Sequence, residues 1–162
     1  MIAEKYKKEI FFLQLKVIKF REKNLSQLAR LISEHNIIGW FTGGSEIGPR
    51  ALGHRSILAD PRLESTKDAI NERVKHRESF RPFAPAIMEE HVSDYFPLNH
   101  KSQFMLEVHE FKDAVKEKVG AVIHDDGTGR LQTVSPEECP EFYDLIDEFF
   151  KITGVPILLN TS

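Results

Sequence analysis

The sequence contains no apolar stretch near the roughly 20 residues that cross a bilayer as a helix. Its first residues also lack the apolar segment, followed by small residues, of a secretory signal. We therefore expect a soluble, cytoplasmic protein. The single cysteine, Cys139, has no partner for an internal disulfide and stands in an expected loop between Glu138 and Pro140. No motif surrounds it, so we expect no catalytic or redox role.

An excess of positive charge is also missing, because 22 basic and 25 acidic residues give a net charge of −3. This balance argues against general binding to nucleic acid or to an anionic membrane. The basic residues are nevertheless concentrated, since residues 48–81 contain six arginines and two lysines against five acids. A local cationic patch on an acidic chain suits a small polyanion such as ATP better than a long polymer.

The usual spacings of metal-binding residues are absent as well. The seven histidines do not form H-x-x-x-H or H-E-x-x-H, and we expect no metal site built by this chain alone. Asp125 and Asp126 offer carboxylates for the Mg²⁺ that accompanies ATP. With the following Gly127 they also form a tight-turn signal, and the turn is the simpler interpretation.

The 162 residues are enough for one domain with a core. Helices are predicted over residues 24–35 with Asn24 as the cap, over 65–74 where Ser65 and Asp68 resemble a capping box, and over 140–153. Strands are predicted from apolar runs over 37–41, 56–59, 101–108, 119–124 and 155–159. Residues 80–88 contain two prolines and are predicted to form an edge strand or an extended segment. Residues 1–23 are interpreted as a peripheral helix or strand, and the whole predicts a mixed α/β domain.

A glycine- and arginine-rich segment, residues 43–56, lies between two predicted strands. Glycines let backbone N–H groups approach an anion, and the planar arginine fork matches phosphate or carboxylate oxygens. No Gly-Lys-Ser/Thr follows, so the segment is not a Walker A loop, and it lacks the G-x-G-x-x-G spacing of dinucleotide sites. We favour an anion site over the alternative of a solvated turn with surface arginines.

A second cationic cluster occupies residues 75–85. Its prolines restrict the backbone and its aromatic side chains can form the wall of a pocket. Arg77 and Arg81 share one side of the chain in either a helical or an extended conformation. A structural ion pair with Glu78 or Asp60 remains the alternative role for each arginine.

Three long motifs, in order, closely resemble the C-terminal domain of the nodulation and antibiotic O-carbamoyltransferases, a family that includes tobramycin carbamoyltransferase. The motifs are residues 46–62 (EIGPRALGHRSILADPR) with 80–85 (FRPFAP), residues 124–134 (HDDGTGRLQTV) and residues 154–162 (GVPILLNTS). The resemblance begins near Leu25, and we assign residues 24–162 to this domain.

The resemblance implies a YrdC-like fold, an open twisted mixed sheet with flanking helices and a concave, positively charged surface. It also implies that the domain combines ATP with carbamoyl phosphate to give carbamoyl adenylate and pyrophosphate, with Mg²⁺ entering as the ATP complex. A separate N-terminal domain of the actin-like ATPase class, for which this chain has no room, would then pass the carbamoyl group to an acceptor hydroxyl. The attacking carbamate is already an anion, so no general base is required.

The resemblance and this chemistry together point to nine site residues. Fixed guanidinium groups stabilise the charge that develops on the phosphoryl oxygens and on the departing pyrophosphate. The predicted catalytic residues are Arg50, Arg55 and Arg81. The residues predicted to bind nucleotide or substrate are Ser56, Lys75, Arg77, Arg130, Asn160 and Ser162. For Asn160 the alternative role is to cap the last strand.

The sequence departs from the family pattern at two points. The family usually carries Phe-Asn after the Asn-Thr-Ser triplet, whereas this sequence ends at Ser162, which indicates an excised domain or one truncated at its C-terminus. Gly44 and Ser45 stand where a longer pair, often basic or containing methionine, is expected. A non-catalytic nucleotide- or RNA-binding module is one alternative function. A fragment that works only when docked to its N-terminal domain is another.

Overall fold

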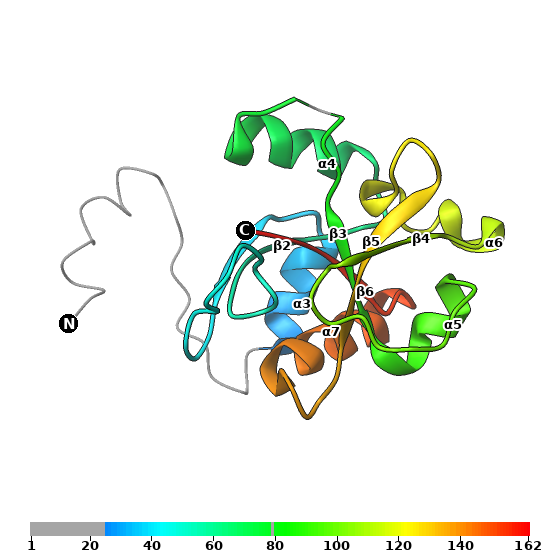
Figure 1. The fold of residues 1–162 in the computed structure, drawn as a ribbon. Coiled ribbons are helices and arrows are strands. Elements are labelled where there is room, and N and C mark those ends of the chain that lie inside the picture. Colours follow the sequence, from blue (N-terminus) through cyan, green and yellow to red (C-terminus); the bar gives the residue numbers. More distant parts are fainter. Residues whose placement is uncertain (1–24, 79) are drawn as a thin grey trace.

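The fold is that of a computed structural model, which describes residues 25–78 and 80–162. Its centre is one open sheet of six strands in the order β1-β2-β6-β3-β5-β4, with helices packed around it (Figure 1). The strands are β1 (Ile38–Phe41), β2 (Arg55–Ala59), β3 (Ala84–Met88), β4 (Glu107–Glu110), β5 (Thr128–Val134) and β6 (Ile157–Thr161). Among these pairs only β3 and β5 run parallel. The predicted open mixed sheet with flanking helices is confirmed.

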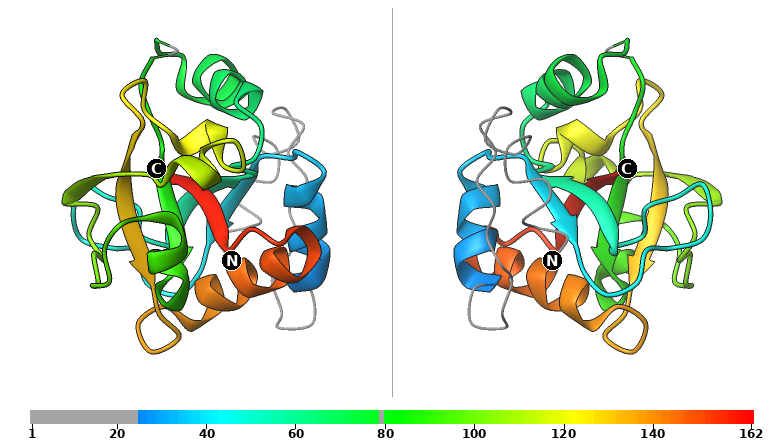
Figure 2. Two further views of the ribbon diagram at one scale, coloured as in Figure 1. Left: turned by 90° about the vertical axis from the view of Figure 1, so that its right-hand side faces the viewer. Right: turned by 90° about the vertical axis from the view of Figure 1, so that its left-hand side faces the viewer.

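The helices on this sheet are α3 (Leu25–Ser33), α4 (Ser65–Ile70), α5 (Val92–Tyr95), α6 (Asp113–Lys116) and α7 (Pro140–Thr153). The longest, α7, begins with Pro140 at its first turn and ends at Gly154, whose φ of 72° is the left-handed conformation that glycine adopts easily. It packs beside α3, and the two contact β2, β3 and β6 (Figure 2). The apolar stripe of α7 is buried: Phe142, Leu145, Ile146 and Phe149. No helix in the part of the chain that the structure describes is long and apolar enough to span a membrane.

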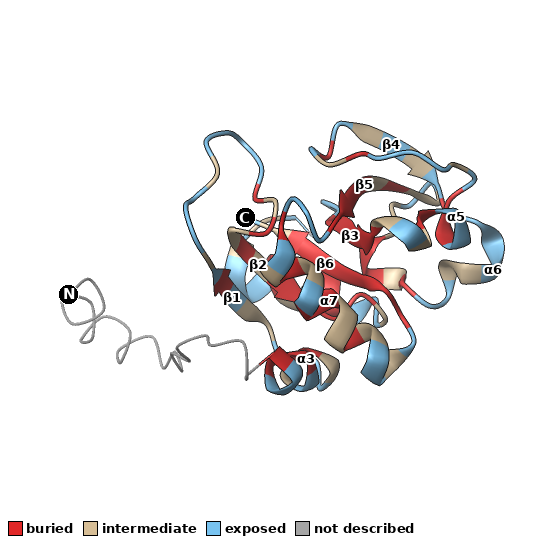
Figure 3. Cartoon of the chain, turned by 90° about the horizontal axis from the view of Figure 1, so that it is seen from below, coloured by how far each residue is buried: buried red, intermediate tan, exposed pale blue. Residues whose placement is uncertain are grey.

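Strand β6 lies in the middle of the sheet, although it is the last strand of the sequence. It pairs with β2 on one side and with β3 on the other, both antiparallel. Residues 157–160 are buried, and Figure 3 shows β6 and β3 as almost wholly buried strands. The end of β6 therefore lies beside segments that are about 100 and 75 residues away in the sequence.

Two of the predicted strands are wrong. In the 119–124 run, residues 120–122 form a short 3₁₀ helix with Ala121 and Val122 buried, and the N–H of Ala121 donates to the carbonyl of Pro61. A buried apolar run can belong to either structure, and periodicity alone does not separate them. Of residues 101–108, only 107 and 108 are in a strand, as the start of β4. The prediction also missed β5, because its buried positions include Gln132 and Thr133.

The prediction of an edge strand or an extended segment over residues 80–88 is wrong for residues 84–88, because these form β3, an interior strand. Proline has no backbone N–H to donate to a neighbouring strand. Pro85 lies in the part of β3 that pairs with β6, whereas β5, on the other side, pairs only with residues 86–88. The missing N–H therefore costs no hydrogen bond to β5. The capping box is also absent: Glu64 precedes α4 and no side chain caps it. The predicted helix does extend to Lys75, but its last residues, Asn71–Lys75, form a π-helical turn. Asn24 and residues 1–23 lie outside the described residues.

Candidate nucleotide and substrate cleft

A cleft of about 360 Å³ opens where the end of β6 meets two loops. One loop contributes residues 49–51, and the other follows α4 and contributes residues from Lys75 to Ala84. Met105, His124 and Arg130 complete the lining from the β4–β5 side. Seven of the nine predicted site residues line this cleft: Arg50, Lys75, Arg77, Arg81, Arg130, Asn160 and Ser162.

The lining carries a strong excess of positive charge. Its described residues include four arginines and one lysine, and no aspartate or glutamate side chain. Burial, followed by the nearby charge of Arg77, lowers the pKa of Lys75. Burial and then the charge of Arg81 likewise lower the pKa of Arg77, while Glu78 acts in the opposite direction. These cations repel one another across the cleft. A polyanion bound between them relieves the repulsion, so the cleft favours polyanion binding.

Arg77 is held in position by Asn71 and by Phe83, which itself lines the cleft. Its Nε donates to Oδ1 of Asn71 at 2.7 Å, and its guanidinium carbon lies 4.8 Å from the centre of the Phe83 ring. The left-handed residue His76, with φ of 48°, turns the chain between the π-helical turn and Arg77. Asn71 is buried and also accepts the backbone N–H of Arg77. The side chain is thus preorganised, a property that benefits electrostatic stabilisation of a developing charge.

Arg81 is less constrained. Its Nε lies 2.9 Å from Oε2 of Glu78, and about half of each side chain is exposed. The structural ion pair considered as the alternative for the arginines is therefore present here, in a form that solvent screens strongly. Arg50 is exposed on the opposite loop.

Arg55 and Ser56 do not line the cleft, in contrast to the other predicted site residues. The Nη2 of Arg55 donates to the carbonyls of Gly48 at 2.6 Å and Arg50 at 3.2 Å, and its Nε lies 3.4 Å from Oε2 of Glu46. Ser56 is buried, and its hydroxyl accepts the N–H of Gly53 at 3.1 Å. In this geometry both residues shape the loop that carries Arg50.

Glu46, which the sequence interpretation did not single out, organises the same loop. Its Oε1 accepts the N–H groups of Leu52 at 2.6 Å and His54 at 2.9 Å. Burial acts to raise the pKa of Glu46, but these backbone hydrogen bonds prevail and lower it. The sequence does not reveal this role, because Glu46 and Arg55 are nine residues apart in an irregular segment and meet only in the folded loop.

Asn160 joins the sheet to that loop. Its Nδ2 donates to the carbonyl of Ala51 at 3.0 Å and to Oε1 of Gln132 at 2.7 Å, while Nε2 of Gln132 donates to the carbonyl of Leu52 at 2.9 Å. These contacts fix the orientation of the amide. Oδ1 is a buried acceptor that makes no hydrogen bond within the described structure, and the residue lines the cleft. A buried acceptor without a donor is costly and indicates a place for a ligand N–H or O–H.

His124 presents a second such atom. Its Nδ1 lies 2.9 Å from Oγ1 of Thr128, and Nε2 is buried without a hydrogen bond in the described structure. Burial lowers the pKa of His124, with Arg130 acting in the same direction and Asp126 opposing it. The lowered pKa favours the neutral form of this ring, which lines the cleft.

The Asp125–Gly127 segment forms the predicted turn. Asp126 Oδ1 accepts the backbone N–H of Thr128 at 3.0 Å and its hydroxyl at 2.6 Å, and Gly127 has φ of 82°. Asp125 lies 3.6 Å from Nζ of the buried Lys67. Both carboxylates have partners within the domain, which favours the turn interpretation over a Mg²⁺ site.

Cys139 is buried directly before α7, and burial raises the pKa of its thiol to about 11. Its Sγ lies 3.8 Å from Nε2 of His54. The thiolate is the reactive form of cysteine, and a raised pKa keeps the thiol protonated near neutral pH.

Comparison with solved structures supports the fold. The chain resembles full-length HypF, solved in a phosphate- and nucleotide-bound form, with a TM-score of 0.58 and 17% sequence identity. The match covers 91% of this chain and 18% of HypF.

Sequence relatives are much closer. The chain is 50% identical over 140 residues to the nodulation protein NolNO of Sinorhizobium fredii, covering 85% of this chain and 21% of that protein. It is also 50% identical over 140 residues to the nodulation protein NolO of Bradyrhizobium diazoefficiens, covering 85% of this chain and 26% of the relative. The chain thus spans about a quarter of the length of these relatives.

A family model described as the carbamoyltransferase C-terminus matches residues 29–162. These residues include every strand of the sheet and every residue that lines the cleft. The chain belongs to the carbamoyltransferase family and corresponds to its C-terminal domain.

Proposed function

We propose that the cleft binds ATP and a carbamoyl donor and forms carbamoyl adenylate. The observation that carries this proposal is the convergence of five cationic side chains, without an acidic one among the described lining residues, on a buried amide acceptor. The chain also shares its fold with part of HypF, a protein solved in a phosphate- and nucleotide-bound form.

The chemistry that we propose proceeds in two steps. Water first cleaves carbamoyl phosphate to carbamate and phosphate. A carbamate oxygen then attacks the α-phosphorus of ATP, the bond from that phosphorus to the bridging oxygen breaks, and pyrophosphate leaves. Negative charge grows on the α-phosphoryl oxygens and on the leaving group, and fixed cations lower the barrier electrostatically.

The cleft residues divide this work by position. Arg77 and Lys75 are half-buried and face the phosphoryl group in this proposal, whereas the exposed Arg50 and Arg81 attract the β- and γ-phosphates. Asn160 Oδ1 accepts a hydrogen bond from the carbamoyl NH₂, since its own Nδ2 is already committed to Ala51 and Gln132. Mg²⁺ enters with ATP, because the carboxylates of Asp125 and Asp126 have partners within the domain.

Transfer of the carbamoyl group to an acceptor hydroxyl belongs, in this proposal, to a separate N-terminal domain of the actin-like ATPase class. Relatives about four times as long as this chain have room for such a domain. The cleft would then supply the activated carbamoyl group rather than choose its acceptor.

Exchange of pyrophosphate into ATP, dependent on carbamoyl phosphate, tests the proposal directly. Arg77→Ala is expected to reduce the exchange rate by about 100-fold, the usual cost of one charge-stabilising group. Arg73→Ala is the matched control: Arg73 is exposed on the same π-helical turn but lies outside the cleft lining, and its removal is expected to leave the rate unchanged.

A folded chain that binds ATP without any exchange would contradict adenylation. Restored exchange after adding the N-terminal domain would then identify a fragment that depends on that domain. Tight RNA binding with a steep salt dependence, lost in Arg50→Ala, would instead favour a nucleic-acid-binding module.

A further inference from the structure

A second group of reactive side chains lies on the sheet edge, outside the cleft. It consists of His100, in the loop before β4, and of Glu107 and His109, both in β4. Glu107 and His109 are two residues apart in a strand, so their side chains lie on the same face. Strand β4 is at the edge of the sheet, and the side chains of His100, Glu107 and His109 are all partly exposed.

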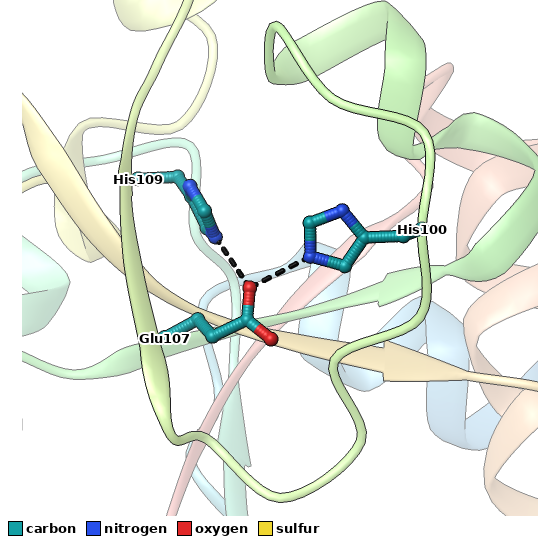
Figure 4. Close-up of side chains that lie close together, drawn as sticks. All are labelled: His100, Glu107 and His109. Carbon is teal, nitrogen blue, oxygen red and sulfur yellow. Dashed lines mark hydrogen bonds and ion pairs between the residues drawn. The ribbon is translucent and has the colours of Figure 1, made fainter.

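The three side chains converge on one point (Figure 4). Nε2 of His100 lies 2.7 Å and Nε2 of His109 lies 2.8 Å from the same carboxylate oxygen, Oε2 of Glu107. One ligand atom from each residue lies within 4.8 Å of the others. The imidazole rings are 5.8 Å apart and steeply inclined to each other, so they approach the carboxylate from different directions.

We propose that His100, Glu107 and His109 bind a divalent transition-metal ion, most readily Zn²⁺, with a fourth coordination position open to solvent. Two imidazoles and one carboxylate are a common protein ligand set for zinc. A small adjustment of the side chains replaces the two N–H···O bonds by bonds to the ion, with loss of the protons on Nε2. Imidazole ligands favour Zn²⁺ over Mg²⁺ or Ca²⁺, which prefer oxygen.

The lysines near this cluster in the sequence pair with other groups and do not compete with a metal ion for Glu107. The Nζ of Lys101, the residue next to His100, lies 2.8 Å from Glu89. On the other side, Lys116 lies near Glu110 and Asp113 rather than near Glu107. Lys112, which lies closer to His109 in the sequence, donates from Nζ to the carbonyl of Ser93 at 2.5 Å, so each of these three lysines has a partner within the domain.

The metal would connect the two ends of a loop that reaches the cleft. Met105 lies between His100 and Glu107, is buried with a positive φ of 55°, and lines the cleft. Phe104 and Leu106 beside it are exposed. An ion bound by His100 and by β4 would restrict this loop and hold Met105 against the cleft.

Competition between the tag-free chain and a chromophoric zinc chelator tests the site. One Zn²⁺ per chain is expected. The zinc affinity of His100→Ala and of His109→Ala should be lower by about 100-fold or more, because loss of even a supporting residue around a metal lowers the metal affinity by about 10–100-fold. Mg²⁺ is expected not to compete. Co²⁺ should give the intense visible absorption of a tetrahedral complex with wild type only.

His91→Ala is the matched control, since His91 also pairs with a carboxylate, Asp94 at 2.9 Å, but has no third ligand among the residues that the structure describes. Its zinc affinity should equal that of wild type. Hydrogen exchange of residues 101–106 should slow on adding Zn²⁺ to wild type and not to His109→Ala. Equal zinc binding by wild type and His109→Ala, with circular dichroism showing both folded, would overturn the site. The readouts do not depend on adenylation, so failure of the pyrophosphate exchange leaves them interpretable.

Discussion

The two arginine-rich segments of this domain use the same side chain for different purposes. In the first loop, Arg55 turns inward to carbonyls and to Glu46, and supports the loop that carries Arg50. In the second, Arg77 is supported by Asn71 and Phe83 and remains available to the cleft. The difference lies in what each guanidinium contacts: that of Arg55 binds the backbone of its own loop, whereas that of Arg77 lines the cleft.

Removal of Glu46 is expected to have the largest effect, because it removes the support of the first loop. Glu46→Ala leaves the N–H groups of Leu52 and His54 without their acceptor and Arg55 without its ion pair. We expect a loss of about 3 kcal/mol in the free energy of unfolding, measured by urea denaturation, since hydrogen bonds to a charged group are among the strong ones. Glu46→Gln keeps Oε1 and should lose less than half as much. Equal losses in the two variants would mean that the acceptor oxygen is not what supports the loop.

The second segment allows a smaller and more selective change. Arg81 is half exposed and screened by Glu78, so Arg81→Ala should reduce pyrophosphate exchange by about 10-fold, less than the effect expected for Arg77. Glu78→Gln should raise ATP affinity about 2-fold by releasing Arg81. The exchange assay measures the first effect and isothermal titration with ATP measures the second. A larger loss of exchange in Arg81→Ala than in Arg77→Ala would reverse the proposed ranking.

A weak pH dependence of ATP binding is also expected. Burial and Arg77 lower the pKa of Lys75 from the usual value of lysine. The protonated amine attracts phosphate, so affinity should fall by about 3-fold as the pH rises through this lowered pKa, and not at lower pH. Lys75→Arg keeps its charge over the same range and should abolish the dependence. Parallel pH profiles of the two proteins would exclude Lys75 as the titrating group.

The local elements were predictable where the signal is local. The 140–153 helix has Pro140 at its start, Gly154 at its end and an apolar stripe between them, and all three appear in the structure. Strand β5 was missed because Gln132 is a buried polar residue, satisfied by Leu52, which is 80 residues away. No periodicity reveals a partner at that distance.

The site was predictable to a similar degree. Residue type and the family resemblance pointed to nine positions, and seven of them line one cleft, where their roles remain predictions. The separate place of Arg55 depends on Glu46 and on the carbonyls of Gly48 and Arg50, which are contacts that only the folded loop creates. The histidine cluster escaped the sequence interpretation because His100 and His109 are nine residues apart and meet only through the loop before β4.

The central position of β6 has a consequence for biosynthesis. Without it, the sheet would consist of β1–β2 on one side and β3–β5–β4 on the other, with no hydrogen bonds between them. A ribosome therefore has to deliver Ile157–Thr161 beyond its exit tunnel before either part can join the other, and the same strand brings Asn160 to the cleft. Nascent chains of increasing length, probed by protease, should become resistant in one late step, when the final strand emerges and the binding site closes with the fold.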